Sequence, residues 1–147
     1  MISQKEIDEL NAIAVKQLNA LDIKRLAVAV SGSAQSLILL NAAVQAADSE
    51  NLVAITADDG SIKQEVIDII NKACESVHVE FVTVPLPYDE TSDSNNKSLI
   101  FPLIMHEAWI RGFDLTAFGC TDSNINQGGN EILSHMNGVI CPFCDFN

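Results

Sequence analysis

The sequence predicts an α/β fold, in which a doubly wound, mostly parallel sheet of four to five strands carries helices on both faces. Three observations support this prediction. Apolar, strand-like segments alternate along the chain with segments of helical periodicity. Ala, Ile, Leu and Val supply most of the apolar residues and aromatics only 5% of the chain, which is typical of a sheet covered on both faces. Polar segments follow three of the predicted strands, where sheets of this class bind ligands.

The N-terminal part begins with a predicted helix over residues 4–20, where Ser3 and Glu6 form a capping box. Its apolar residues recur at helical spacing: Ile7, Leu10, Ala14, Leu18 and Leu21. A strand at residues 24–30 and a helix at residues 34–47 then begin a right-handed β-α-β unit.

The middle of the chain continues this alternation. A strand is predicted at residues 52–57, then a helix capped by Ser61 that ends near residue 75, then a strand at residues 77–84. The helix residues expected to face the sheet are Ile62, Val66, Ile69, Ile70 and Ala73.

The C-terminal part contains the last predicted helix and strand of the sheet layer. They cover residues 98–111 and 113–118. A loop rich in Gly and Asn follows at residues 119–130, then a short helix at 131–136 and a tail from 138 to the end. The chain shows no internal repeat or linker, so we expect one domain over residues 1–147.

The most informative segment is the run from Leu26 to Ser36. Five apolar residues lead into the turn Ser31-Gly32-Ser33-Ala34-Gln35-Ser36, which opens a helix. Amide groups and a helix dipole converge at such a turn and can hold a phosphate. It lacks the lysine of the Gly-Lys-Ser/Thr phosphate loop and two glycines of the dinucleotide fingerprint. An ordinary turn capped by a serine is the alternative.

Three polar loops are expected to meet at the carboxyl edge of the sheet. They are residues 31–36, 58–60 and 119–130. This convergence predicts a ligand-binding site, which could take a mononucleotide and a small-molecule substrate. Within it, Asp58 could contact ribose hydroxyls or hold Mg²⁺, or it could simply build a turn.

The charge balance limits the ligands. Twenty acidic and eight basic residues give a net charge of −12, which argues against duplex nucleic acid as the main partner. Solubility in a crowded cell would also explain the acidity. No apolar run is long enough to span a bilayer and the N-terminus has no apolar core, so we expect a cytoplasmic protein.

Ser31-Gly32-Ser33-Ala34-Gln35-Ser36 resembles the PP-loop of the N-type ATP pyrophosphatases, whose motif is Ser-Gly-Gly-x-Asp-Ser. The resemblance implies an adenine nucleotide alpha hydrolase-like fold and ATP or AMP with Mg²⁺ as ligand. The residues that would bind the nucleotide are Ser31, Gly32, Ser33, Gln35, Ser36, Asp58 and Gly119.

The segments Lys97-Ser98-Leu99-Ile100-Phe101, Phe113 to Gly119 and Cys141-Pro142-Phe143-Cys144-Asp145 resemble the 7-cyano-7-deazaguanine synthase branch of this superfamily, which serves queuosine biosynthesis. That resemblance implies a ligase. ATP would adenylate a carboxylate, an amine would displace AMP, and an amide or nitrile would form. Lys97 would be the catalytic basic residue, whereas Lys63 and Arg111 are better explained as helix-end charges.

The loop also departs from the motif. Ser33 stands at the second glycine and Gln35 at the aspartate, and a neutral amide is a poor ligand for Mg²⁺. The alternative is therefore an inactive relative that binds a nucleotide or deazapurine, or that acts as a protein-interaction module. A nucleotide binder of the stress-protein type is a third option, with Gly128-Gly129 as its phosphate loop. A homodimer or a protein partner could cover apolar helix faces.

Cys141-x-x-Cys144 is spaced as one half of a structural zinc site, and Cys120 and His135 are the best candidates for the other two ligands. Redox chemistry and simple apolar cysteines are the alternatives. Cys74 is expected in the core. We expect His78 and His106 to have packing roles. The aromatic residues Trp109 and Phe113 are expected in the core or in an interface.

Overall fold

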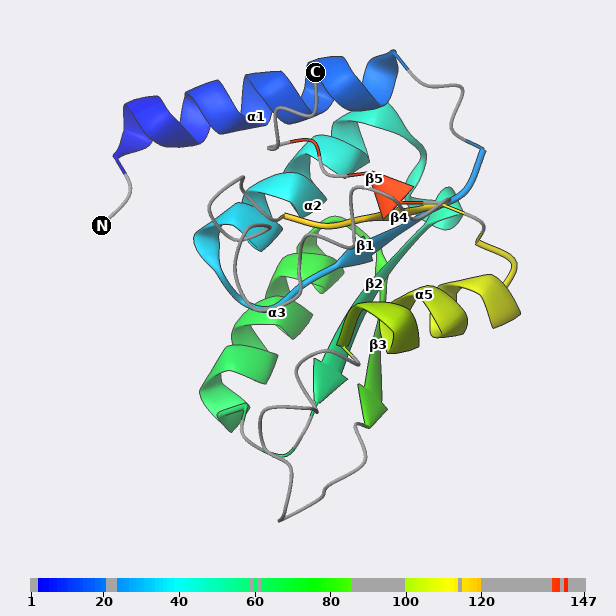
Figure 1. Ribbon diagram of the computed structural model, residues 1–147. Helices are drawn as coiled ribbons and strands as arrows, with labels where there is room; N and C mark the ends of the chain where they lie inside the picture. Colours follow the sequence, from blue (N-terminus) through cyan, green and yellow to red (C-terminus); the bar gives the residue numbers. More distant parts are fainter. Residues whose placement is uncertain are drawn as a thin grey trace.

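In the computed structural model, five strands form one parallel sheet in the order β3-β2-β1-β4-β5 (Figure 1). The structure describes residues 3–20, 24–58, 60, 62–85, 100–113, 115–119, 139–140 and 142. The strands are β1 (Leu26–Ala29), β2 (Leu52–Asp58), β3 (Glu80–Pro85), β4 (Thr116–Ala117) and β5 (Val139–Ile140). This architecture confirms the predicted fold class.

Helices cover both faces of the sheet (Figure 1). They are α1 (Gln4–Asn19), α2 (Ala34–Ala46), α3 (Gln64–Ser76) and α5 (Ile100–Ile110), with a short 3₁₀ turn, η1 (Ser49–Asn51). Helices α2 and α3 pack on one face and α1 lies over α2, whereas α5 packs on the opposite face. No helix in the described ranges is long and apolar enough to cross a membrane.

Helix boundaries follow local caps. The hydroxyl of Ser3 accepts from the amide of Glu6 at 3.2 Å, as the capping box predicts, and Ser33 caps α2 in the same way. The prediction for α3 was wrong at its start, because Lys63 is the N-cap residue and makes no side-chain cap bond. Ser61 lies outside the described residues.

The core has two parts, one on each face of the sheet. Cys74 is buried in the larger part and Phe113 in the smaller, as predicted. Ile69 was expected to face inward but is 53% exposed, because Ile70 takes the inward position and successive helix residues are rotated by about 100°. Trp109 is 70% exposed and therefore is not a core residue.

Candidate functional site

The segment between β1 and α2 forms a tight loop at the carboxyl end of β1. The backbone turns at Gly32, where φ is +88°, a conformation that favours glycine. The hydroxyl of Ser33 then accepts a hydrogen bond from the amide of Ser36 at 3.2 Å and so caps α2. The first turn of α2 contains no acidic residue, so no carboxylate there offsets the positive end of the helix dipole.

Serine hydroxyls occupy part of the hydrogen-bonding capacity of this loop. The amide of Ser31 donates to Ser36 Oγ at 3.2 Å, and the amide of Ser33 donates to Ser31 Oγ at 3.4 Å. The hydroxyls of Ser31 and Ser33 are 3.1 Å apart. Of the six backbone amides of residues 31–36, those of Ser31, Ser33 and Ser36 thus donate to serine hydroxyls.

The remaining amides of the loop are available. Within the described part of the chain, the backbone N–H groups of Gly32, Ala34 and Gln35 have no hydrogen-bond partner. Ala34 and Gln35 are the first two residues of α2, where N–H groups have no partner inside the helix. Free amides at the start of a helix are suited to an anion.

Helix α3 supports this loop from below. A Cβ atom added to Gly32 would lie 2.5 Å from Cγ1 of Val66 and 3.7 Å from Cδ1 of Ile70. The loop backbone therefore rests directly on α3, and a side chain at position 32 would push the two apart.

Gly119 lies against the same loop. A Cβ atom at Gly119 would be 3.2 Å from the backbone of Gln35 and 3.2 Å from that of Ser36. The end of β4 and the start of α2 therefore approach backbone to backbone, as the predicted convergence of strand ends requires. The candidate residues Ser31, Gly32, Ser33, Gln35, Ser36 and Gly119 are thus brought together in one place.

Asp58 ends β2 at the same edge of the sheet. Its Oδ1 accepts a hydrogen bond from the amide of Gly60 at 2.8 Å, so the carboxylate builds the turn that follows the strand. The side chain is half-buried. This contact is the turn alternative considered for Asp58, and it leaves the second carboxylate oxygen for other partners.

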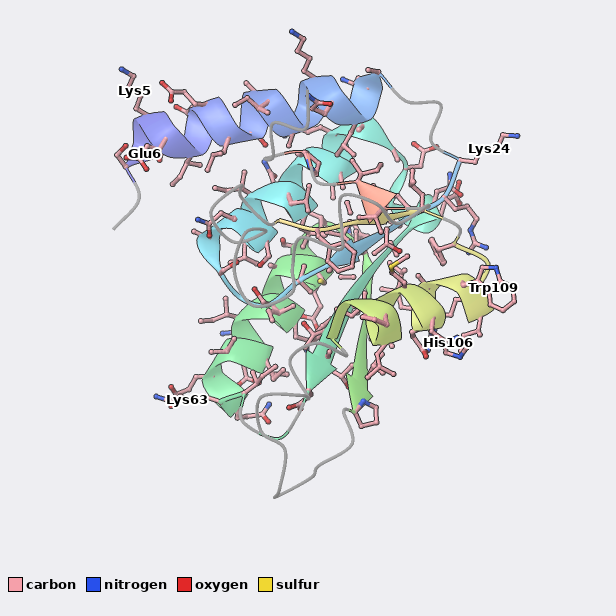
Figure 2. The ribbon with its side chains drawn as sticks, viewed as in Figure 1. Lys5, Glu6, Lys24, Lys63, His106 and Trp109 are labelled. Atoms are coloured by element: carbon pink, nitrogen blue, oxygen red, sulfur yellow. The ribbon has the colours of Figure 1, made fainter. Side chains whose placement is uncertain are left out.

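Basic candidates are separated from the loop where the structure describes them. Lys63 is exposed and points away from the sheet (Figure 2). Arg111 pairs with Glu107 at 2.8 Å and with Glu80 at 3.9 Å, near the start of β3 at the opposite edge of the sheet. Both placements agree with helix-end charges.

Several predicted site residues lie outside the described residues. They are Lys97, Cys120, His135, Cys141 and Cys144. The described residues contain no group of three His, Cys, Asp or Glu side chains that could hold a metal ion.

One residue of this region was missed by sequence reasoning. Thr56 is 1% exposed, and its hydroxyl donates to the carbonyl oxygen of Val30, the residue that precedes the loop. A threonine near the carboxyl end of an otherwise apolar strand was the available signal.

Comparison with known proteins gives similarity of fold only. No protein-family model matches the chain, and no curated protein matches it. Among solved structures, an NH3-dependent NAD synthetase from Campylobacter jejuni, in complex with the nitrate ion, is similar with a TM-score of 0.63 and 11% identity. The match covers 100% of this chain and 69% of the synthetase.

Two further structures are similar. A glutamine-dependent NAD+ synthetase from Acinetobacter baumannii, in complex with ADP, has a TM-score of 0.68 and 15% identity over 87% of this chain and 28% of its own. The U34-tRNA thiolase NcsA from Methanococcus maripaludis, with its 4Fe-4S cluster, has a TM-score of 0.66 and 20% identity over 93% of this chain and 59% of its own. These neighbours are members of the PP-loop ATP pyrophosphatase superfamily. This chain shares their fold and spans about a quarter to two thirds of their length.

Proposed function

We propose that this chain binds an adenine nucleotide, ATP or AMP, with its phosphates at the loop of residues 31–36. The observation that carries the proposal is a set of three amides, those of Gly32, Ala34 and Gln35, which have no hydrogen-bond partner among the described residues and lie just before and at the start of α2. The fold shared with PP-loop proteins, one of them in complex with ADP, supports it.

The described residues divide the binding of such a ligand among them. Phosphate oxygens accept from the amides of Gly32, Ala34 and Gln35, and the dipole of α2 favours their negative charge. Gly119 lets the end of β4 approach the loop backbone at Gln35 and Ser36 with no side chain between them. The second carboxylate oxygen of Asp58, to which no described residue donates a hydrogen bond, can accept from a ribose hydroxyl or bind Mg²⁺ that arrives with ATP.

The donor set fits Mg²⁺ only in part. Asp58 offers one carboxylate, and Gln35 offers an amide where the PP-loop motif has aspartate. Mg²⁺ keeps several waters and is usually held by one or two carboxylates together with the substrate phosphates. We therefore propose that the metal is held mainly by the nucleotide, and that Gln35 weakens its binding relative to an aspartate.

The narrower proposal is an ATP-dependent ligase of the 7-cyano-7-deazaguanine synthase type. The α-phosphorus of ATP would be attacked by a substrate carboxylate, with pyrophosphate as leaving group. An amine would then attack the acyl carbon and release AMP, forming an amide, the precursor of a nitrile. The loop amides would stabilise charge on the phosphates, and Lys97 is proposed to do the same.

The test is isothermal titration calorimetry with ATP and AMP, each with and without Mg²⁺, together with an assay of pyrophosphate release. Tight binding of either nucleotide supports the proposal, and Mg²⁺-dependent pyrophosphate release supports the ligase. Binding without turnover favours the inactive relative. No binding of ATP or AMP would contradict the proposal.

The variant Gln35→Asp restores the carboxylate of the motif and is expected to raise the affinity for ATP with Mg²⁺ by about tenfold. Affinity for AMP without Mg²⁺ should fall, because the added charge repels the phosphate. Gln17→Asp adds the same charge on the exposed side of α1 and serves as the control.

A further inference from the structure

We infer that Thr56 and Ser36 are positioning residues that fix the peptide group between Val30 and Ser31 and so aim the loop amides at the phosphates. The inference rests on the proposed nucleotide binding. It concerns one residue that lies outside the PP-loop motif and one inside it.

Two hydroxyls hold this one peptide group from opposite sides. Its carbonyl oxygen, on Val30, accepts from the hydroxyl of Thr56 on β2. Its N–H, on Ser31, donates to Ser36 Oγ on α2 at 3.2 Å. Because a peptide group is planar and rigid, fixing both ends fixes its orientation. The next N–H group along the chain is that of Gly32, the first donor of the loop that has no partner in the part of the chain the structure describes.

The position of Thr56 explains why a side-chain donor is needed for the carbonyl oxygen of Val30. The amide of Val30 donates to the carbonyl of Ile55 at 2.9 Å, and the β1–β2 register ends at the pair of Ala29 and Ile55. Beyond this point β1 leaves the sheet to enter the loop. The hydroxyl of Thr56 supplies the donor to Val30 at the place where the register stops.

The burial and the hydrogen bonds of Ser36 indicate that its hydroxyl positions the loop and does not contact the ligand. Its side chain is only 3% exposed, and its hydroxyl donates to the carbonyl of Ser33 at 2.9 Å while accepting from Ser31. Its single O–H proton is therefore already used within the loop and is not offered to a phosphate. Thr56 is 1% exposed, and a buried hydroxyl is costly unless it is bonded, so both bonds are expected to persist.

The experiment compares variants that remove or keep each hydroxyl. Thr56→Val keeps the shape and removes the donor, and we expect about tenfold weaker binding of ATP with Mg²⁺ in calorimetry. Thr56→Ser keeps the donor and should restore affinity to within about twofold. Thr116→Val is the matched control, since Thr116 is also buried but pairs in register with Ala27, away from the loop. It should leave affinity unchanged.

Ser36→Ala provides a second, independent measurement. If Ser36 and Thr56 act on the same peptide group, the double variant Thr56→Val with Ser36→Ala should bind ATP little worse than the single variant with the lower affinity. If Ser36 instead donates to phosphate, the two losses should multiply, and this result would overturn the inference. Urea unfolding of each variant verifies that it is folded at the temperature of titration.

The outcomes separate the two proposals. Wild-type protein that binds neither ATP nor AMP contradicts the proposed function and the inference together. Wild-type binding that survives unchanged in folded Thr56→Val contradicts the inference alone. Weaker binding in Thr56→Val, restored in Thr56→Ser and absent from Thr116→Val, supports it, because a general loss of buried hydroxyls would affect both threonine-to-valine variants.

Discussion

At the scale of single residues, the thiol of Cys74 lies in the core on the inner side of α3. Burial raises the pKa of this thiol from 9.0 to about 11. The unfolded chain therefore loses its proton first, and the free energy of unfolding should fall as pH rises from 9 toward 11, by about 1 kcal/mol at pH 10. Urea unfolding at pH 8 and pH 10 measures this loss. Cys74→Ala should lose less over the same interval, and an equal loss would exclude the thiol as its source.

His78 adopts a backbone conformation that glycine prefers. Its φ is 61° just after α3, where its amide donates to the carbonyl of Glu75 at 3.2 Å and that of Val79 donates to Cys74 at 2.9 Å. Since the side chain is exposed, His78→Gly should raise the free energy of unfolding by about 0.5 kcal/mol, the relief of strain exceeding the entropic cost of glycine. Lys72→Gly, at an exposed position inside α3, should lower it by about 1 kcal/mol. Thermal melts compare the three proteins, and a lower melting temperature for His78→Gly would contradict this account.

At the scale of elements, the approach of β4 to α2 leaves little room for a side chain at Gly119, since an added Cβ would lie 3.2 Å from the backbone of Gln35 and Ser36. An added methyl group would meet backbone atoms of Gln35 and Ser36, which cannot rotate away. Gly119→Ala should therefore lower the free energy of unfolding by about 1–3 kcal/mol and weaken nucleotide binding. Gly60→Ala is the comparison, because φ is +88° there but no atom of the described residues lies within 4 Å of an added Cβ, so the substitution adds conformational strain rather than a close contact. Chemical denaturation and calorimetry should show the larger loss at Gly119.

The same scale shows how far local sequence determines an element. The starts of α1 and α2 were predicted correctly because their N-caps, Ser3 and Ser33, are local signals. Strand ends were predicted less well. A strand was expected at residues 113–118, but within the described part of this segment the register with β1 covers Thr116–Ala117, because a ladder needs a partner strand as well as apolar residues. The β5 strand lies in what the sequence presented as a tail.

At the scale of the whole molecule, the parallel sheet and the convergence of Ser31–Ser36 with Gly119 were predicted from the alternation of strands and helices, whereas the strand order β3-β2-β1-β4-β5 was not predicted. The hydrogen bond from Thr56 to Val30 was not predicted, since it depends on which strand lies beside β1 and on where their register ends. Sequence spacing places residues on elements, whereas contacts between elements require the packed structure.

The zinc site stays a prediction for the whole chain. We expect elemental analysis of the purified protein to find about one zinc per chain, held by Cys141, Cys144, Cys120 and His135. Removal by a chelator should lower the melting temperature, because bound metal stabilises the folded chain. The pair Cys141→Ser and Cys144→Ser should lose the metal, while Cys74→Ser should keep it. Protein without zinc after refolding in its presence would contradict the prediction.

The number of register pairs between neighbouring strands differs on the two sides of the proposed site. Among the residues the structure describes, six register pairs join β2 to β3 and four join β1 to β2, whereas two join β1 to β4 and two join β4 to β5. Amide hydrogens of Thr116 and Ala117 should therefore exchange with deuterium sooner than those of Val53 and Ile55. A ligand bound between Gly32 and Gly119 would connect the part of the sheet with more register pairs to the part with fewer. Saturating nucleotide should therefore slow amide hydrogen exchange most at Thr116 and Ala117 of β4.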